Sequence, residues 1–383
     1  MPTIAYYNPG YELSVERGTT HFTPSKLVGQ LRRDLATLPF YYTDSDDLIL
    51  LPSPLPPALS HDRFVTALPR GGTLQPWGWA PELLSLIPVA SFPYTLRVMR
   101  QLTSRALTLE LWQCLRQVAP TWLQPYSTPI AITSLSEVTP LLLSAHQSGG
   151  VVLKDEFSSS GRGVEFVPPT RNLGERIEQR LGKKGRRGAK SLFLEPWHQG
   201  AVRDVGYEFE INEMGEVVYL GVSFFRTAKG QYLGNHLGPA VELEQEAKCL
   251  PMHPTHDATI QHLTQALTLM PTLRQYRGRL GVDLLLATLP NSNDLQLTPP
   301  LEINCRTTMG HLALALGDQW LSPQQRARFQ IHYDSHLATL LSPQLHSSEP
   351  LYLHPAEPLH TSGLYLLTPL LPDSQFAATL ELL

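Results

Sequence analysis

A lysine followed by a loop of small residues is the first feature of the sequence that could do chemistry. The stretch VVLKDEFSSSGRGVEFV, residues 151–167, contains an apolar run ending in Lys154, a serine- and glycine-rich loop and a second apolar run. The backbone N–H groups and hydroxyls of such a loop can bind a phosphate, and lysine adds a point charge. A hairpin loop solvated by its serines has the same composition, because short glycine motifs recur without function. On this stretch alone both interpretations stay open.

A second candidate site lies in the runs RLGVDLLLA and LQLTPPLEINCR, which the turn-rich PNSND separates. Side chains alternate along a strand, so Glu302, Asn304 and Arg306 are expected on one face. A hairpin centred at residues 292–293 places Asp283 opposite Glu302. Opposed carboxylates repel by a few tenths to about 1 kcal/mol, so a cation is expected between them. A magnesium ion held by carboxylates and by phosphate oxygens would meet this need.

The adjacent prolines Pro299 and Pro300 weaken the register of that hairpin, because a slip of one residue reverses every face. A solvent-facing strand pair without a metal is the alternative interpretation.

A third candidate lies in SLFLEPWHQG, where an apolar strand runs into Glu195, Pro196 and Trp197. A flat nucleobase could lie there, with Glu195 accepting a hydrogen bond from a ribose or an amino group. Taken alone, the stretch is equally an ordinary strand end.

The elements that must position these residues alternate between helix and strand. Apolar spacing predicts helices over 25–38, 102–120 (with Ser104 as N-cap), 134–148, 170–184, 256–276 and 322–341. Strands are predicted over 3–7, 47–51, 151–154, 191–197, 205–212, 216–225, 280–289 and 295–305, with a closing strand within 362–371.

Composition bounds the protein class. The chain has 383 residues, 42% hydrophobic and 17% charged, a net charge of -4 and a mean hydropathy of -0.13. This acidic balance argues against nucleic acid as a partner. No apolar run approaches the about 18 residues of a membrane span, and the first ten residues lack a signal peptide's pattern. Three dispersed cysteines fit a reducing compartment, so we expect a cytoplasmic protein.

In order along the chain, these motifs resemble those of the ATP-grasp superfamily of carboxylate–amine ligases, over about residues 95–325. The motifs are Arg105, Lys154, SSSGRG, LEPW, Asp283 and LEINCR. The ordered set carries the resemblance, since SSSGRG by itself is weak. PWGW, near residue 77, is similar to a stretch in uncharacterised bacterial members.

The resemblance implies an α/β (α+β) ATP-grasp fold with a small N-terminal α/β domain over 1–100. It places a subdomain with a glycine-rich flap over 101–190. A second subdomain over 191–383 would hold the hinge, the metal site and the closing strands.

The resemblance also implies roles for residues. The nucleotide-binding set would be Arg105, Lys154, Ser158, Ser159, Ser160, Gly161, Arg162, Gly163, Glu195, Pro196 and Trp197. Asp283, Glu302 and Asn304 would bind Mg²⁺, with Mn²⁺ as an alternative ion. Arg306 would face the acyl phosphate, so Arg306 and Lys154 are the expected catalytic residues. Two positions depart from the family's pattern: Arg105 replaces its usual lysine, and Asp155 replaces its frequent proline.

The implied activity joins a small-molecule carboxylate to an amine, using ATP. A nucleotide-binding protein that has lost catalysis is the alternative, although such a chain should have lost part of the metal set. The sequence leaves a homodimer open.

The loop FFRTAKGQYLGNHLG follows a strand and is the expected substrate loop, through Arg226, Tyr232, Asn235 and His236. A plain strand connection is the alternative for each of them. The basic loop KKGRRGAK, residues 183–190, is interpreted as solvated, with contact to an anionic substrate left open.

Overall fold

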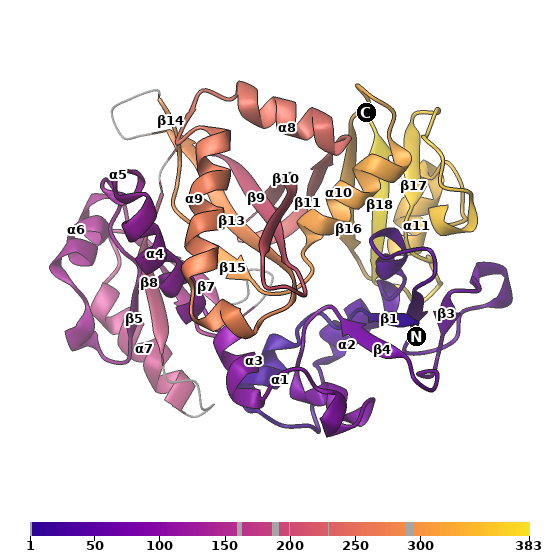
Figure 1. Ribbon diagram of the computed structural model, residues 1–383, viewed down its shortest axis with the longest axis horizontal. Coiled ribbons are helices and arrows are strands. Elements are labelled where there is room, and N and C mark those ends of the chain that lie inside the picture. Colours follow the sequence, from indigo (N-terminus) through magenta and orange to yellow (C-terminus); the bar gives the residue numbers. More distant parts are fainter. Residues whose placement is uncertain (1, 159–162, 186–190, 199, 229, 289–293) are drawn as a thin grey trace.

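Three β-sheets organise the computed structural model, which describes residues 2–158, 163–185, 191–198, 200–228, 230–288 and 294–383 (Figure 1). The first sheet lies in the N-terminal part, the second in a small unit that follows, and the third runs through the larger remainder. The mixed α/β class predicted from the sequence is confirmed.

The N-terminal sheet is parallel and has the order β3-β2-β1-β4. Its strands are β1 (Thr3–Tyr6), β2 (Leu48–Leu50), β3 (Phe64–Val65) and β4 (Thr73–Pro76). Helices of this part are α1 (Glu12–Arg17), α2 (Lys26–Asp34) and α3 (Leu96–Thr103). The strand order reverses between β1 and β4, and parallel sheets usually bind ligands beyond the carboxyl ends of the strands at such a point.

The small sheet is antiparallel and has the order β5-β8-β6-β7. Its strands are β5 (Ile130–Ile132), β8 (Leu192–Pro196), β6 (Val151–Asp155) and β7 (Val164–Val167). One face packs on α6 (Pro140–Ser148) and α7 (Leu173–Gly185), through a core that includes Leu153, Leu194 and Ile177. Because side chains alternate, Lys154 and Glu195 lie on the opposite face.

The large sheet has the order β12-β14-β13-β9-β10-β11-β16-β18-β17, and β15 also pairs with β13. Its main strands are β9 (Ala201–Ile211), β10 (Val217–Ala228), β11 (Gln231–Leu237), β13 (Gly278–Thr288) and β15 (Glu302–Asn304). The others are β12 (Met252–His253), β14 (Leu295–Leu297), β16 (Ala327–Tyr333), β17 (Gly363–Leu366) and β18 (Phe376–Leu382).

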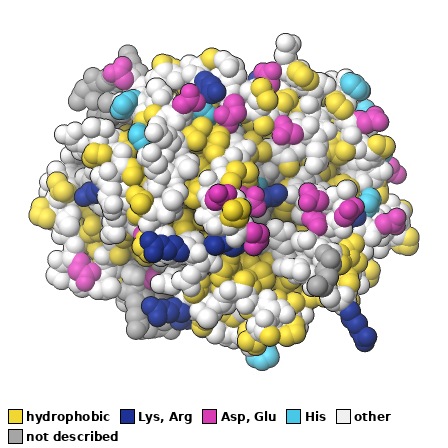
Figure 2. Space-filling view, viewed as in Figure 1, with side chains coloured by type: hydrophobic (Ala, Val, Ile, Leu, Met, Phe, Trp, Pro, Cys, Tyr) yellow, Lys and Arg dark blue, Asp and Glu magenta, His cyan; other side chains and the backbone are white. Residues whose placement is uncertain are grey.

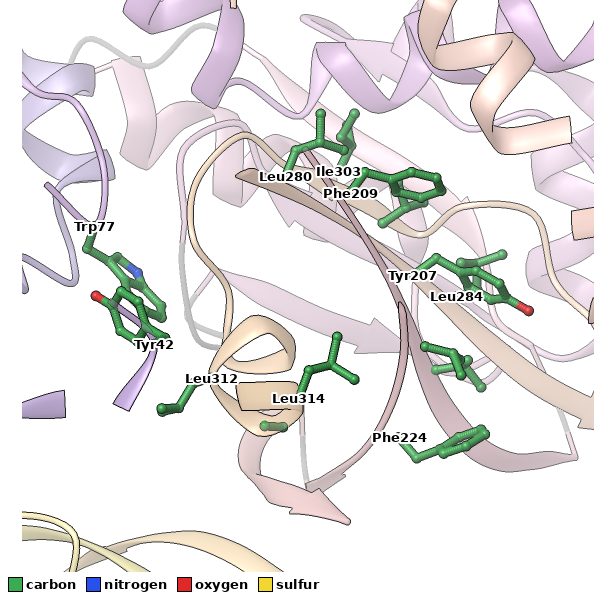
Figure 3. Packing of buried hydrophobic residues seen from close by; sticks show 14 of the residues in the cluster. Tyr42, Trp77, Tyr207, Phe209, Phe224, Leu280, Leu284, Ile303, Leu312 and Leu314 are labelled. Carbon is green, nitrogen blue, oxygen red and sulfur yellow. The ribbon is translucent and has the colours of Figure 1, made fainter. Parts of the chain in front are cut away.

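Helices cover both faces of the large sheet. The first face carries Tyr207, Phe209 and Phe224, and it packs against α4 (Ala106–Val118), α8 (Ala240–Cys249) and α9 (His256–Leu269). The second face is covered in part by α10 (Met309–Trp320). Figure 3 shows Tyr207 and Leu284 well apart from Trp77 and Tyr42, two N-terminal rings whose centroids are 6.0 Å apart.

The helix predicted over 322–341 is wrong. Residues Ala327–Tyr333 form strand β16, and only α11 (Leu337–Leu341) is helical there. Ala327 and Phe329 are buried two residues apart, the period of a strand, and β16 pairs with β11 and β18. The alternating stretch is short. Together with the apolar residues on either side of it, it has a spacing close to that of an amphipathic helix.

Several other helix predictions need new boundaries: α2 ends at Asp34 and α9 at Leu269, before the predicted ends at 38 and 276. The helix predicted from 134 begins at Pro140, because proline fits the first turn and 135–137 form a separate short turn. The helix predicted from 102 is divided at Ser104, an extended residue between α3 and α4 whose hydroxyl accepts from Ala106 N at 3.1 Å. A short α5 (Pro120–Leu123) follows α4.

No helix in the described part of the chain combines the length and the hydropathy that crossing a membrane requires.

Candidate active site

The predicted pairing of two acids across neighbouring strands is confirmed. Asp283 on β13 lies directly opposite Glu302 on β15. The register does shift between β14 and β15, where the prolines lie: Leu286 pairs with Leu297, but Asp283 pairs with Glu302, two residues further than that register would give. A shift by an even number of residues keeps each side chain on its face, and Leu301 N donates to Asp283 O at 2.8 Å. The turn at 292–293, from which this pairing was predicted, lies outside the described residues. Burial, followed by the charge of Glu302, raises the pKa of Asp283 well above its usual range.

Asn304 and Arg306 continue from this acid pair in a chain of hydrogen bonds. Asn304 Nδ2 donates to Asp283 Oδ2 at 3.0 Å, and Arg306 Nη2 donates to Asn304 Oδ1 at 3.1 Å. The structure therefore brings these predicted residues together. The amide oxygen of Asn304 is engaged by Arg306, so the amide would have to rotate before that oxygen could bind a metal.

Arg105 links the start of the flap to the acid pair. Its guanidinium Nη1 lies 3.2 Å from Glu302 Oε2, while Nη2 donates to Ser158 Oγ at 3.0 Å and Nε to Asp155 O at 3.0 Å. The Arg105 side chain is buried, and a small cavity beside it is lined by Ser158, Glu302 and Asn304. If this cavity opened, a phosphate group would meet a buried guanidinium and a hydroxyl already in place.

Lys154 reaches from the small sheet to the large one. Its Nζ lies 2.6 Å from Glu195 Oε2 and donates to Leu301 O, one residue before Glu302, at 3.1 Å. Both side chains of the Lys154–Glu195 pair are buried. Lys154, like Arg105, is therefore a predicted phosphate ligand that forms an ion pair with an acid of the predicted site.

An exposed aromatic pair lies next to Glu195. Trp197, whose side chain is 44% exposed, has its ring centroid 4.7 Å from that of Phe166. Val152 pairs with both Phe166 and Glu195, so these side chains share the face of the small sheet that carries Lys154. Pro196 ends the strand between Glu195 and Trp197. Sequence reasoning missed Phe166, which the alternation of VEFV could have indicated.

The flap itself is only partly described. Ser158 and Gly163 belong to the described residues, whereas Ser159, Ser160, Gly161 and Arg162 lie outside them, as do residues 186–190 of the basic loop. Gly163 has φ +78, and a Cβ there would lie 2.8 Å from the Asp155 side chain. This position therefore favours glycine for both reasons.

The predicted substrate loop divides between two faces of the sheet. The Tyr232 hydroxyl donates to Asn235 Oδ1, and Asn235 is buried. His236 pairs with Phe224, whose ring packs on the first face of the large sheet, so His236 lies on that face. Because side chains alternate, the neighbouring Asn235 lies on the second face. Arg226 is exposed. The structure therefore groups Tyr232 with Asn235 and leaves His236 on the other face.

The N-terminal part supplies residues that sequence reasoning did not assign. Trp77 follows β4, and its ring centroid lies 5.6 Å from the Arg306 guanidinium carbon. Glu12 follows β1, and its Oε1 lies 3.8 Å from Arg306 Nε. These residues therefore lie beyond the carboxyl ends of β1 and β4, where the strand order reverses. Figure 2 shows charged side chains gathered across the middle of the viewed face.

The acid pair fits a magnesium ion. In the described part of the chain, no three His, Cys, Asp or Glu side chains come together as a metal-binding group. Mg²⁺ in phosphate-binding sites is commonly held by one or two carboxylates, with phosphate and water oxygens completing its octahedron. Asp283 and Glu302 supply two such carboxylates. Burial is the first cause of the raised pKa of Asp283 and the charge of Glu302 the second, and a cation between the two acids would offset that charge.

Comparison with known proteins supports the fold. No family model and no curated protein matches the sequence. N5-carboxyaminoimidazole synthetase from Staphylococcus aureus aligns with 100% of this chain and 93% of its own, at 12% identity and TM-score 0.51. An ADP complex of N5-carboxyaminoimidazole ribonucleotide synthetase covers 100% and 92%, at 12% identity and TM-score 0.50. Rhizobium etli pyruvate carboxylase covers 81% of this chain and 28% of its own, at 15% identity and TM-score 0.50. The chain has the ATP-grasp fold, as predicted from the sequence.

Proposed function

We propose that the chain is an ATP- and Mg²⁺-dependent ligase that joins a carboxylate to an amine through an acyl phosphate, releasing ADP and phosphate. The observation that carries this proposal is the acid pair Asp283–Glu302, with Arg105 bound to one acid and Arg306 linked to the other through Asn304. Cations and acids so close together suit a triphosphate and its metal better than a solvated surface.

The proposed reaction needs positioning and charge neutralisation, because a carboxylate is a poor electrophile. Transfer of the γ-phosphoryl group to a carboxylate oxygen forms an acyl phosphate; the amine then attacks its carbonyl carbon, and phosphate leaves. Lys154 and Arg105 would bind the phosphates of ATP, and Arg306 would lie beside the acyl phosphate. Asp283, Glu302 and, after rotation of its amide, Asn304 would hold Mg²⁺, which when bound would neutralise phosphate charge.

Binding of a triphosphate would change the partners of both cations. Lys154 is paired with Glu195 and Arg105 with Glu302. Phosphate oxygens would attract the cations, releasing Glu302 toward the metal and Glu195 toward the ribose or base. The same charges would thus be neutralised before and after binding.

The two small-molecule substrates are proposed to enter from the N-terminal side. The carboxyl ends of β1 and β4 bring Glu12 and Trp77 to Arg306. A substrate carboxylate placed there would meet a guanidinium, whereas Lys154 and the nucleotide approach from the opposite, small-sheet side.

The proposal is tested by ADP release from MgATP with pools of amino acids and small carboxylic acids, and by trapping of acyl phosphate with hydroxylamine. Asp283→Asn is the negative control. A catalytically silent nucleotide-binding protein, the second candidate, would show nucleotide binding without ADP release or hydroxamate formation for any pool.

A further inference from the structure

A buried glutamate that the proposed reaction does not use lies close to the acid pair. Glu208 on β9 is 2% exposed. It pairs with Gly281 on β13, which in turn pairs with Asn304 on β15. Neighbouring strands are about 4.8 Å apart, so the backbone of Glu208 lies about 10 Å from that of Asn304.

Three glycines clear the space that the Glu208 carboxyl group fills. A Cβ at Gly206 would lie 2.7 Å from Glu208 Oε1, and a Cβ at Gly281 would lie 2.7 Å from Oε2. A Cβ at Gly310, the second residue of α10, would collide with Oε1. A side chain at any of these three glycine positions would displace the carboxyl group. The three glycines therefore leave this volume free for Glu208.

Hydrogen bonding fixes the protonation of the neighbouring histidine. His311 Nε2 lies 3.2 Å from Phe209 O, and a carbonyl oxygen only accepts, so Nε2 carries a proton. His311 Nδ1 lies 3.1 Å from Thr308 N, which can only donate. Nδ1 is therefore an acceptor and the ring is neutral. Burial agrees with this assignment, since it lowers the pKa of His311 to about 3.

Glu208 faces that acceptor nitrogen. Glu208 Oε2 lies 3.1 Å and Thr308 Oγ1 lies 2.8 Å from His311 Nδ1, and Oε2 and Oγ1 are 2.7 Å apart. The single proton of the Thr308 hydroxyl can serve only one of these contacts, so the others bring lone pairs together unless Oε2 carries a proton. The other neighbours of the carboxyl group are hydroxyls: Thr308 Oγ1 lies 2.7 Å from Oε2, and Ser223 Oγ lies 3.0 Å from Oε1. Burial raises the pKa of Glu208 to about 7, in the same direction as the geometry.

We infer that Glu208 is a positioning residue that acts as a neutral carboxylic acid: it directs its proton toward His311 and holds Thr308, and through Thr308 the Arg306 segment, in place. An ionised Glu208 would add a negative charge near Asp283 and would compete for the charge of Arg306. The neutral acid accepts from the Thr308 and Ser223 hydroxyls, can also donate toward His311, and leaves the guanidinium to the reacting groups. The assignment of Arg306 to those groups rests on the proposed function; the protonation does not.

The protonation state is tested without any substrate. In ¹⁵N-labelled protein at about pH 5.5 to 6.5, below the pKa of about 7 of Glu208, the His311 ring should show a protonated Nε2 and an unprotonated Nδ1, since the pKa of His311 is strongly lowered by burial. The same spectrum is expected in Glu208→Gln, whose amide donates in place of the acid. An imidazolium signal from His311 in this pH range would mean an ion pair with an ionised Glu208 and would overturn the inference.

The positioning role is tested by paired substitutions with ADP release as the readout. Glu208→Ala should lower kcat by about tenfold or more, while the stabilisation by MgADP is retained. Glu208→Gln should retain most of the wild-type kcat. Glu210→Gln, the same substitution two residues further along β9, is the control for loss of a glutamate on this strand. A Glu208→Gln protein that is as impaired as Glu208→Ala, or that fails to fold, would contradict a neutral acid. If wild type itself shows no ADP release, the proposed function fails while the spectra still decide the protonation.

Discussion

Arg105 Nη1 lies 3.2 Å from Glu302 Oε2, so a buried cation from the start of α4 is bound to the acid that faces Asp283 across the strand pair. The two residues are far apart in the sequence, yet together they define where phosphate and metal would meet. Lys154 and Glu195 repeat the arrangement on the small sheet. In each ion pair, a proposed phosphate ligand contacts an acid that is itself proposed to bind the metal (Glu302) or the nucleotide (Glu195).

Substitutions in the Lys154–Glu195 pair should affect stability and nucleotide binding differently. Lys154→Ala should lower the free energy of unfolding by about 3 kcal/mol, because it leaves Glu195 buried without its cation. The double variant Lys154→Met/Glu195→Gln should recover most of this stability. Both proteins should lose the rise in Tm that MgATP gives the wild type. Thermal unfolding with and without MgATP measures both effects, with exposed Lys248→Ala as control; an unchanged MgATP shift in either variant would remove Lys154 from the phosphate site.

The exposed aromatic pair should report on base binding. Phe166→Ala should weaken MgADP binding by about 0.5–1.5 kcal/mol, as expected for loss of one aromatic contact. MgADP should also change the tryptophan fluorescence of wild type, and Trp197→Phe should abolish most of that change. Titrations of each variant give the affinity. Equal affinity and equal fluorescence change in both variants would place the base elsewhere.

Stability should depend on pH through Glu208. Its pKa is raised from 4.5 to about 7 in the folded chain, so the fold favours the protonated acid. The stabilisation is fully present below pH 4.5 and is lost as pH rises toward 7 and above. Glu208→Gln should remove this component and flatten the decline in unfolding free energy across that interval. Urea titrations of both proteins at several pH values test it, and parallel declines would show that Glu208 does not titrate there.

Glu302→Gln removes charge from the acid pair while nearly keeping its shape. Turnover should fall by orders of magnitude, because the proposed metal loses one of its two carboxylates. The fold should survive, since repulsion with Asp283 is relieved while Arg105 keeps its bonds to Ser158 and Asp155 O. ADP release and Tm, measured on the same preparation, separate the two effects; near-normal turnover would contradict the metal role.

Local periodicity explains what could be predicted from the sequence. Counting outward from residues 292–293 predicted the Asp283–Glu302 pair, and that pair is present, although β14 next to the turn pairs with β13 in a register two residues different. Because the shift is even, the alternation of faces on which the prediction depended is kept. The same alternation predicted that Asn304 and Arg306 would lie together. The helix predicted over 322–341 failed because only neighbouring strands β11 and β18 make Ala327–Tyr333 a strand.

Contacts between distant segments could not be predicted. Nothing local to Glu12 or Trp77 indicates that they meet Arg306, because the meeting depends on how the N-terminal sheet docks. The space around Glu208 depends on glycines from three elements, each of which alone looks like an ordinary strand or helix residue. Such arrangements are visible only in three dimensions.

The central claim is that nucleotide and metal meet at the acid pair, and a crystal structure with Mn²⁺ and a non-hydrolysable ATP analogue tests it most directly. The account predicts an anomalous peak within about 2.0–2.3 Å of carboxylate oxygens of both Asp283 and Glu302, bridging to phosphate oxygens that Arg105 and Lys154 contact. A metal bound elsewhere, with Arg105 still paired to Glu302 and no phosphate at Lys154, would contradict it.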